Sequence, residues 1–180
     1  MLNLKSILKR KVIGLHFHTA VKSLDCKILY IDPAFGRFVE MIANKVDKLI
    51  LFLHQAKSND PLATYKLKHD NIIWEDIGEH KIWELRLIKH NHKMRKSIRK
   101  KIQACDGFII RCDTPLAPEF IEDAKNVPIG IYVGQDYVYA SKSMGFSIQA
   151  IRNRIHSMHY NMRQKQTNKQ IPIAVISNYL

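Results

Sequence analysis

Short apolar runs, rich in β-branched and aromatic residues, alternate along the chain with longer stretches in which apolar residues recur every three or four positions. The first pattern is typical of buried strands and the second of amphipathic helices. The short runs predict strands over residues 27–31, 48–53, 71–74, 107–111, 129–133 and 173–176. The periodic stretches predict helices that begin near residue 38, span 82–105, cover 120–124 and begin again near 148.

Strands that read as continuous apolar runs are buried on both faces, as in a parallel sheet covered by helices. We therefore predict an α/β fold over residues 27–180, with a doubly wound, mostly parallel, Rossmann-like sheet and helices on both faces. Residues 1–26 are predicted to form an N-terminal arm. The start of this arm could be an amphipathic surface helix, and its residues 12–17 could equally be an extra edge strand.

Length and composition narrow the class of protein. With 180 residues, 46% of them hydrophobic, the chain can bury a core of its own. It contains no run of eighteen apolar residues and no secretory signal, so we expect a cytoplasmic protein. Its three cysteines, Cys26, Cys105 and Cys112, form no CxxC pair and indicate neither a disulfide framework nor a zinc site.

The formal net charge of +13 is concentrated in three segments. Residues 1–11 contain four basic and no acidic residues, residues 81–101 nine basic and one acidic, and residues 148–169 five basic and none acidic. A local basic surface favours an anionic partner, which could be nucleic acid or the anionic face of a membrane.

Candidate site residues follow the predicted strands, because ligands of an open parallel sheet bind outside the carboxyl ends of its strands. This rule selects residues 32–37, 111–115, 134–137 and 177–179. Arg111 could bind a phosphate or carboxylate as a planar fork, while Asp113 and Asp136 could accept hydrogen bonds from sugar hydroxyls or act as bases.

Each candidate also has a purely structural interpretation. Gly36 is a lone glycine outside any GxGxxG motif and could simply form a strand-to-helix turn. Arg111 and Asp113 could pair with each other at the surface. Asp136 and Ser177 could cap a turn or a helix.

Other patterns of reactive residues do not indicate a site. The triplet His90-Asn91-His92 lies within a helical period, and His16-Phe17-His18 has no third metal ligand nearby in the sequence. No GxSxG motif occurs, and neither Cys105 nor Cys112 has a local base. We therefore expect no metal and no Ser or Cys nucleophile.

The predicted helix over residues 82–105 carries its own signal. Lys89, Lys93, Lys96 and Lys100 recur near helical spacing. A solvated helix face would show this pattern, but the excess of positive charge around it favours contact with an anionic surface.

Five segments, in this order, resemble the N-terminal, acceptor-side Rossmann domain of retaining GT-B glycosyltransferases, the hexosyltransferases that build surface polysaccharides. The resemblance covers residues 27–180. Its most specific part is the pairing of Arg111-Cys-Asp-Thr-Pro-Leu-Ala-Pro with Tyr132-Val-Gly-Gln-Asp136. The five segments are KILYIDPAFGRFVEMIA, DKLILFLHQA, DGFIIRCDTPLAPEFIEDAK, VPIGIYVGQDYVYASKS and IPIAVISNYL.

The resemblance implies a role for each candidate. Gly36 and Arg37 would lie near the diphosphate of the nucleotide-sugar donor, which is a co-substrate and not a bound cofactor. Asp136 would be catalytic and, with Gln135, would face the transferred sugar. Arg111 and Asp113 would line the acceptor side, and Ser177 would match the substrate-binding serine that commonly closes this domain.

The resemblance also implies partners. The acceptor would be a sugar or a lipid-linked sugar at the inner face of the membrane, where Lys89, Lys93, Lys96 and Lys100 would contact anionic lipid. Such enzymes hold the donor mainly with a second Rossmann domain, on the same or another chain. Residues 1–180 contain no counterpart of that domain and are expected to be inactive alone. The alternative functions are a basic nucleic-acid-binding module and a stand-alone Rossmann-like interaction module.

Overall fold

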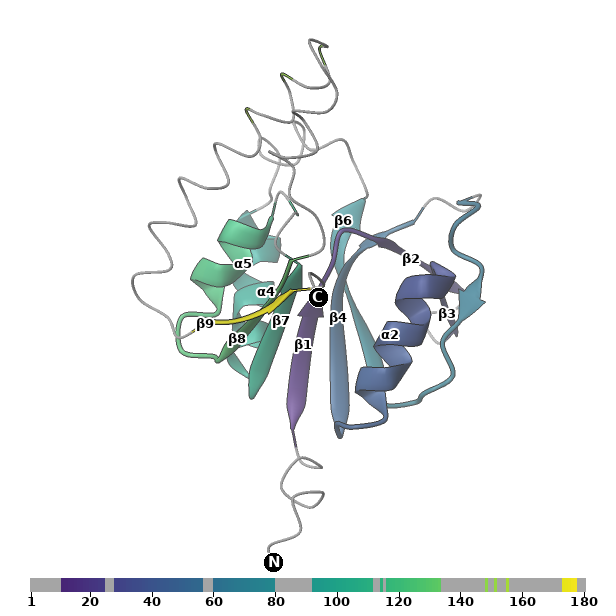
Figure 1. The fold of residues 1–180 in the computed structure, drawn as a ribbon, viewed down its shortest axis with the longest axis horizontal. Helices are drawn as coiled ribbons and strands as arrows, with labels where there is room; N and C mark the ends of the chain where they lie inside the picture. The colour runs from purple at the N-terminus through teal and green to yellow at the C-terminus, as the bar shows by residue number, and fades with distance from the viewer. Residues whose placement is uncertain are drawn as a thin grey trace, which may run out of the picture.

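The fold is described from a computed structural model of the chain. The structure describes residues 11–24, 28–56, 60–79, 92–111, 114, 116–133, 148, 151, 155 and 173–177. These residues form an α/β fold with a mixed, mostly parallel open sheet (Figure 1). The predicted α/β class and the mostly parallel sheet are therefore confirmed.

The parallel part of the sheet has a strand order that reverses direction once. Among the described residues, β2 (Ala20–Leu24) pairs in parallel with the end of β4 over two residue pairs, and six other strands form the continuous parallel part of the sheet. Numbered one to six along the chain, they lie in the order 3-2-1-4-5-6, so the order reverses between β1 and β7. In spatial order they are β6 (Ile72–Glu79), β4 (Lys48–Gln55), β1 (Val12–His16), β7 (Gly107–Arg111), β8 (Ile129–Val133) and β9 (Ile173–Ser177).

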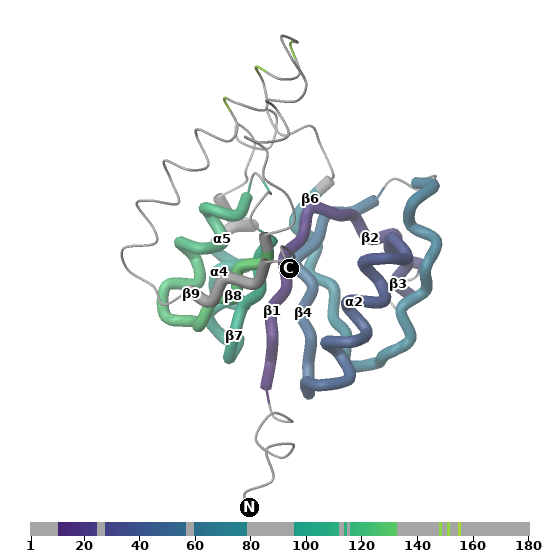
Figure 2. Tube along the Cα trace, in the orientation of Figure 1, coloured from purple at the N-terminus to yellow at the C-terminus, as the bar shows by residue number. Residues whose placement is uncertain are grey.

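An antiparallel insertion separates β1 from the helix that follows it. β2 (Ala20–Leu24) continues past the end of β1, and β3 (Ile28–Ile31) returns antiparallel to it. β3 also pairs antiparallel with the two-residue strand β5 (Tyr65–Lys66). The chain then enters α2 (Pro33–Ala43), so this helix begins near the carboxyl ends of the parallel strands (Figure 2).

Two expectations about the start of the chain differ from the structure. An extra edge strand was one alternative for residues 12–17, but β1 lies inside the sheet between β4 and β7. Residues 27–31 were predicted as the first parallel strand, but β3 pairs only antiparallel among the described strands. Gly14 and two histidines break up the apolar run around β1, whereas β3 has the more typical strand sequence.

The side chains of β4 alternate between two buried clusters, as expected of a strand buried on both sides. Leu49, Leu51 and Leu53 join one cluster, and Ile50 and Phe52 join the other. The first cluster includes Phe35, Val39 and Ala43 of α2. The second includes Ile98 and Ile102 of α4 (His92–Gln103) and Phe120 and Ile121 of α5 (Ala117–Asp123).

The remaining element predictions are largely confirmed, with shifted ends. β6 continues past the predicted end at Trp74 to Glu79, and α2 begins at Pro33 instead of near residue 38. α4 occupies part of the predicted span 82–105, of which residues 82–91 lie outside the described residues. In the part of the chain that the structure describes, no helix combines the length and apolar character needed to cross a membrane.

Candidate ligand-binding pocket

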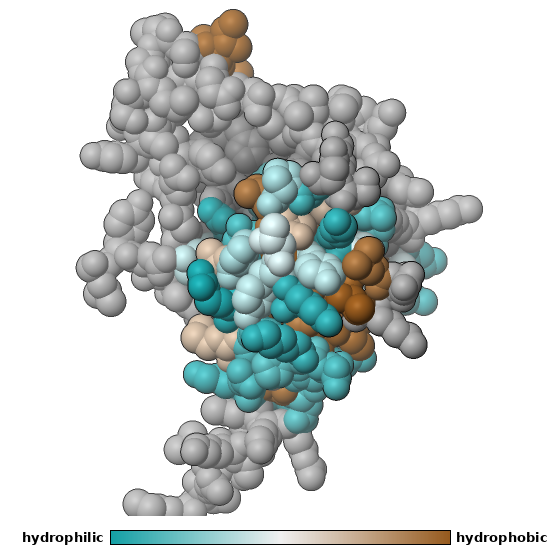
Figure 3. All heavy atoms as spheres, turned by 90° about the vertical axis from the view of Figure 1, so that its right-hand side faces the viewer, coloured by the Kyte–Doolittle hydropathy of each residue, from teal (hydrophilic) through white to brown (hydrophobic). Residues whose placement is uncertain are grey.

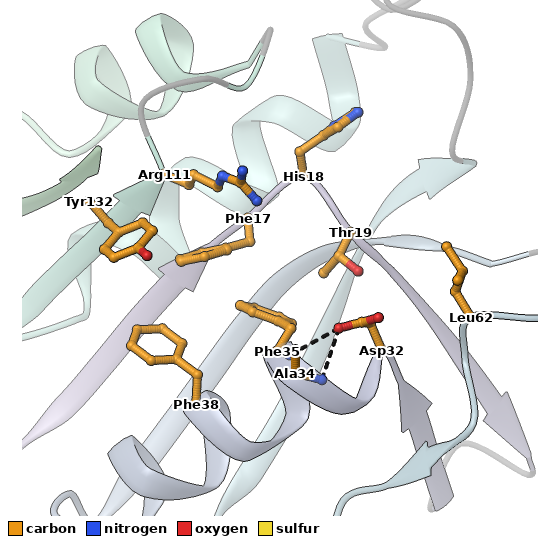
Figure 4. Close-up of a pocket in the computed structure, with 10 residues that line it drawn as sticks. All are labelled: Phe17, His18, Thr19, Asp32, Ala34, Phe35, Phe38, Leu62, Arg111 and Tyr132. Carbon is orange, nitrogen blue, oxygen red and sulfur yellow. Dashed lines mark hydrogen bonds between the residues drawn. The ribbon is translucent and has the colours of Figure 1, made fainter. Parts of the chain in front are cut away.

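A cavity of about 440 Å³ opens where the strand order reverses, beyond the carboxyl ends of β1, β7 and β8. It is formed by the segment that follows β1, the start of α2, the loop before β5 and the last residues of β7 and β8 (Figure 4). The lining residues are Phe17, His18, Thr19, Asp32, Ala34, Phe35, Phe38, Leu62, Arg111 and Tyr132.

Four aromatic rings form the apolar wall of the pocket. The ring centre of Phe17 lies 4.5 Å from that of Phe35, 5.5 Å from that of Phe38 and 5.6 Å from that of Tyr132. Phe17 and Phe35 are buried, while Phe38 and Tyr132 are only partly covered. Rings held by one another at these separations form a preformed surface against which a ligand ring can pack.

Arg111 supplies positive charge beside this aromatic wall. It is the last residue of β7, where it lies in register with Tyr132 of β8. Its guanidinium carbon is 5.8 Å from the centre of the Phe17 ring, within the range of a cation–π contact. The close-up shows the Arg111 side chain reaching over Phe17 at the pocket (Figure 4).

Asp32 supplies negative charge on another side of the pocket, and it also begins α2. Its Oδ1 accepts hydrogen bonds from the backbone amides of Ala34 and Phe35, both at 3.0 Å. Its carbonyl oxygen accepts from the Gly36 amide at 2.7 Å, and Pro33 has no amide to donate. The first amides of α2 are therefore already bonded by Asp32, and they do not form an open phosphate cradle.

Gly36 has a packing role that the sequence did not reveal. A Cβ atom added to it would lie 2.4 Å from Cδ1 of Tyr65, so the missing side chain makes room for that ring. The neighbouring Arg37 is exposed and is not among the residues that line the pocket. The predicted contacts of Gly36 and Arg37 with a donor diphosphate stay predictions.

Glu40 anchors the segment that brings Leu62 to the pocket. Its carboxylate accepts a 2.6 Å hydrogen bond from the Tyr65 hydroxyl and a 2.9 Å bond from the Lys68 amide. Burial raises the pKa of Glu40, but these bonds and the charges of Lys68 and His69 outweigh burial and hold the pKa below its usual value. The bond to Glu40 in turn raises the pKa of Tyr65.

His16 holds together the elements beneath the pocket. Its Nδ1 lies 2.8 Å from the carbonyl oxygen of Phe52, and its Nε2 lies 3.1 Å from the Thr114 hydroxyl. The ring stacks on Phe120 with centres 4.2 Å apart. His16 is thus a buried histidine of the core. No group of three His, Cys, Asp or Glu side chains within the described part of the chain could hold a metal ion.

The described cysteine is not suited to be a nucleophile. Cys105 is buried, and its thiol donates to the carbonyl oxygen of Lys101 at 3.3 Å. Burial, with the charge of Asp106, raises the pKa of the Cys105 thiol to about 11, although Lys48 opposes part of this rise. Cys26 and Cys112 lie outside the described residues.

Several predicted site residues share the carboxyl edge of the sheet. Ser177 ends β9 in register with Val133, the last residue of β8, so Arg111 and Ser177 both end strands on the same edge. Asp113, Gln135 and Asp136 lie outside the described residues. The structure brings Arg111 together with the turn that contains Asp32 at one pocket, although the strand before that turn is not the parallel strand from which the strand-end rule selected it.

The prediction missed most of the pocket wall. Phe17, His18 and Thr19 were missed because β1 was not recognised as the central strand. Placing β1 at the centre would have identified them, since they directly follow its carboxyl end. Tyr132 and Phe38 had no chemical signal in the sequence beyond being aromatic.

The basic surface of α4 lies on a different element from the pocket. Lys96 and Lys100 are exposed and make no ion pair with any described residue. Arg99 forms a 2.7 Å salt bridge with Asp123 of α5, and Lys101 pairs with Glu75 of β6. Part of the positive charge of α4 is therefore neutralised by neighbouring elements. Lys89 and the side chain of Lys93 lie outside the description.

The side of the molecule that carries α2 and β5 presents a mainly hydrophilic surface with small apolar patches (Figure 3). Met41 of α2 is 53% exposed and Leu62 at the pocket is 65% exposed. Single exposed apolar residues of this kind are normal on protein surfaces.

Comparisons with models of known protein families, with curated proteins and with solved structures find no match to this chain.

Proposed function

We propose that this chain is the acceptor-side domain of a nucleotide-sugar glycosyltransferase, and that the pocket binds its sugar acceptor. We also propose that the sheet is a doubly wound, Rossmann-like sheet with helices on both faces. The observation that carries the functional proposal is the position of the pocket, which lies at the reversal of a 3-2-1-4-5-6 strand order. Open α/β sheets bind their ligands at this point.

The composition of the pocket supports a sugar as the ligand. Partly exposed rings of Phe38 and Tyr132 offer apolar faces to the C–H face of a pyranose. The ligand's hydroxyls can donate to the Asp32 carboxylate and bond with the Thr19 hydroxyl. Few polar groups on an aromatic wall are typical of small-molecule sites.

The remaining roles follow from the sequence resemblance. The sequence after β7 contains Asp113 and the sequence after β8 contains Gln135 and Asp136, and we propose that Asp136 faces the reacting sugar. Both strands end at the edge where the pocket opens, which supports this assignment. Because Asp32 already bonds the first amides of α2, the donor diphosphate gains little from the start of that helix.

Lipid-linked acceptors would bring the domain to the inner face of a membrane. The exposed Lys96 and Lys100 of α4 support contact with anionic lipid. Arg99 pairs with Asp123 and Lys101 with Glu75, which reduces the positive charge available to the lipid. Nucleic acid would use the same charge, but α4 has no Phe, Tyr or Trp ring for base stacking.

The proposal is tested by titrating the ¹⁵N-labelled chain with methyl glycosides of glucose, galactose and mannose, with UDP and with single-stranded RNA. At least one glycoside is expected to shift the backbone amides of Phe17 and Thr19. Phe38→Leu removes a ring face but keeps apolar bulk, so the affinity should fall by up to about tenfold.

Met41→Leu is the matched control on the exposed face of the same helix, and it should leave binding unchanged. Shifts with RNA alone, or no shift with any of the glycosides, would contradict the sugar-binding proposal.

A further inference from the structure

We infer that the pocket selects a neutral sugar, and that Asp32 and Thr19 recognise two neighbouring hydroxyls on one edge of its ring. This inference rests on the proposed function and narrows its substrate class to uncharged pyranoses with an unsubstituted vicinal diol.

The first step is the charge of the pocket. Among the described residues that line it, Arg111 is the one Lys or Arg side chain and Asp32 the one Asp or Glu side chain. Their formal charges cancel, so these residues give the pocket no excess charge that would attract an ionic ligand. Arg111 also has interactions within the protein, among them the Phe17 ring at 5.8 Å. A charged ligand would lose hydration here without gaining a counter-charge, which favours a neutral one.

The second step is the hydrogen-bonding capacity of Asp32. A carboxylate has about four acceptor positions, shared equally by its two oxygens. The amides of Ala34 and Phe35 both donate to Oδ1, each at 3.0 Å, and so occupy that oxygen. Oδ2 accepts no hydrogen bond from any residue that the structure describes. A charged acceptor oxygen therefore remains for the hydroxyls of a ligand.

The third step is the position of Thr19. It lines the same pocket, and its hydroxyl makes no hydrogen bond with a described residue. Thr19 and Asp32 are both half-buried, so part of each stays open to a ligand. The close-up shows them on one side of the pocket and the rings of Phe38 and Tyr132 on the other (Figure 4). A pyranose that packs its C–H face on the rings would turn one edge of hydroxyls toward Thr19 and Asp32.

Neighbouring hydroxyls suit this pair of residues. Oδ2 of Asp32 only accepts hydrogen bonds, whereas the Thr19 hydroxyl can donate or accept. One ligand hydroxyl can donate to Oδ2 while its neighbour bonds with Thr19. Because hydrogen bonds to an ionised group are about twice as strong as neutral ones, Asp32 contributes most of the selectivity. A sugar without that hydroxyl would leave Oδ2 unpaired in the complex and bind more weakly.

The test compares the methyl glycosides of glucose, galactose and mannose on the ¹⁵N-labelled chain and continues with the one that binds most tightly. Its 2-, 3-, 4- and 6-deoxy forms and its uronide are then titrated. Removal of the hydroxyl should weaken binding by about 10- to 100-fold at two neighbouring positions and by less than about threefold elsewhere. The uronide should bind no more tightly than the neutral parent.

Asp32→Asn assigns the sensitive hydroxyl to its partner. Asparagine is also a good N-cap, so its amide oxygen can accept from the α2 amides while its amide nitrogen, a donor, faces the pocket. The penalty for removing the hydroxyl that bonds Oδ2 should then shrink by about 5- to 10-fold.

Thr19→Val removes a hydroxyl without changing the cap of α2, and it should shrink the penalty at the neighbouring position. This variant decides the matter if Asp32→Asn does not fold. Asp47→Asn makes the same charge change at an exposed residue beyond the far end of α2, and it should keep both penalties in full.

The outcomes separate the two proposals. If a glycoside binds but no neighbouring pair of positions is sensitive, or if both pocket variants keep every penalty, the inference fails and the sugar-binding function stands. Tighter binding of the uronide also overturns the inference. If none of the neutral glycosides binds, both proposals fail. Binding of uridine but not of 2′-deoxyuridine would in that case assign the diol to a ribose.

Discussion

At the residue scale, Gly36 shows how one amino acid can have two different interpretations. From the sequence, its small size suggested the close approach of a ligand. In the structure, the ring that approaches it is Tyr65, which Glu40 holds by a 2.6 Å hydrogen bond. The sequence could not distinguish these because Gly36 and Tyr65 are distant along the chain.

Gly36→Ala is expected to destabilise the protein by about 1–3 kcal/mol, because the new methyl group would overlap the Tyr65 ring. In a Tyr65→Ala background the same change should be neutral or stabilising, since alanine is favoured over glycine within a helix by about 1 kcal/mol. Urea unfolding of the unchanged protein, the two single variants and the double variant measures the coupling between Gly36 and Tyr65. An equal effect in both backgrounds would show that Tyr65 is not the reason for the glycine.

At the element scale, α4 illustrates which features a local pattern can predict. Its buried Ile98 and Ile102 and exposed Lys96 and Lys100 follow the predicted period of 3.6 residues. The ion pairs of this helix could not be predicted, because Asp123 and Glu75 come from other elements.

If α4 docks on anionic lipid, changing both Lys96 and Lys100 to Gln should weaken binding to vesicles with 30% anionic lipid by about 30-fold at low salt. The loss should shrink as salt rises, because screening weakens all such contacts. The control is Lys45→Gln with Lys66→Gln, which removes two exposed charges elsewhere. Sedimentation with the vesicles measures the affinity of both double variants. If the two double variants lose the same affinity, net charge and not α4 attracts the membrane.

At the scale of the whole molecule, the position of β1 decides how the sheet is built. β1 joins β4 on one side and β7 on the other, so both halves of the sheet depend on it. Gly14 faces Phe108 so closely that an added Cβ would lie 2.3 Å from the ring. Phe108 is 1% exposed and has no room to move away.

Gly14→Ala should therefore lower the global free energy of unfolding by about 1–3 kcal/mol, and hydrogen exchange should accelerate in β4 and β7 as well as in β1. Gly130→Ala is the matched control, because its Cβ would lie an ordinary 3.8 Å from Ile109. Faster exchange confined to residues 11–24 after Gly14→Ala would instead support an edge position for β1, which was one alternative from the sequence.

The sequence by itself determined most of the strands and helices, because apolar periodicity acts over a few neighbouring residues, but it did not indicate β2 or β5. It also indicated that Arg111 lies at the edge where ligands bind, through a rule that holds for any parallel sheet. The turn at Asp32 lies at the same pocket, but the strand before it is antiparallel, so that rule does not explain its position.

Only the tertiary structure decided that β1 is central, that β2 and β3 are inserted beside it, and that Phe17 and Tyr132 complete the pocket. These features depend on pairing between strands that are far apart along the chain, and local pattern carries no information about such pairing.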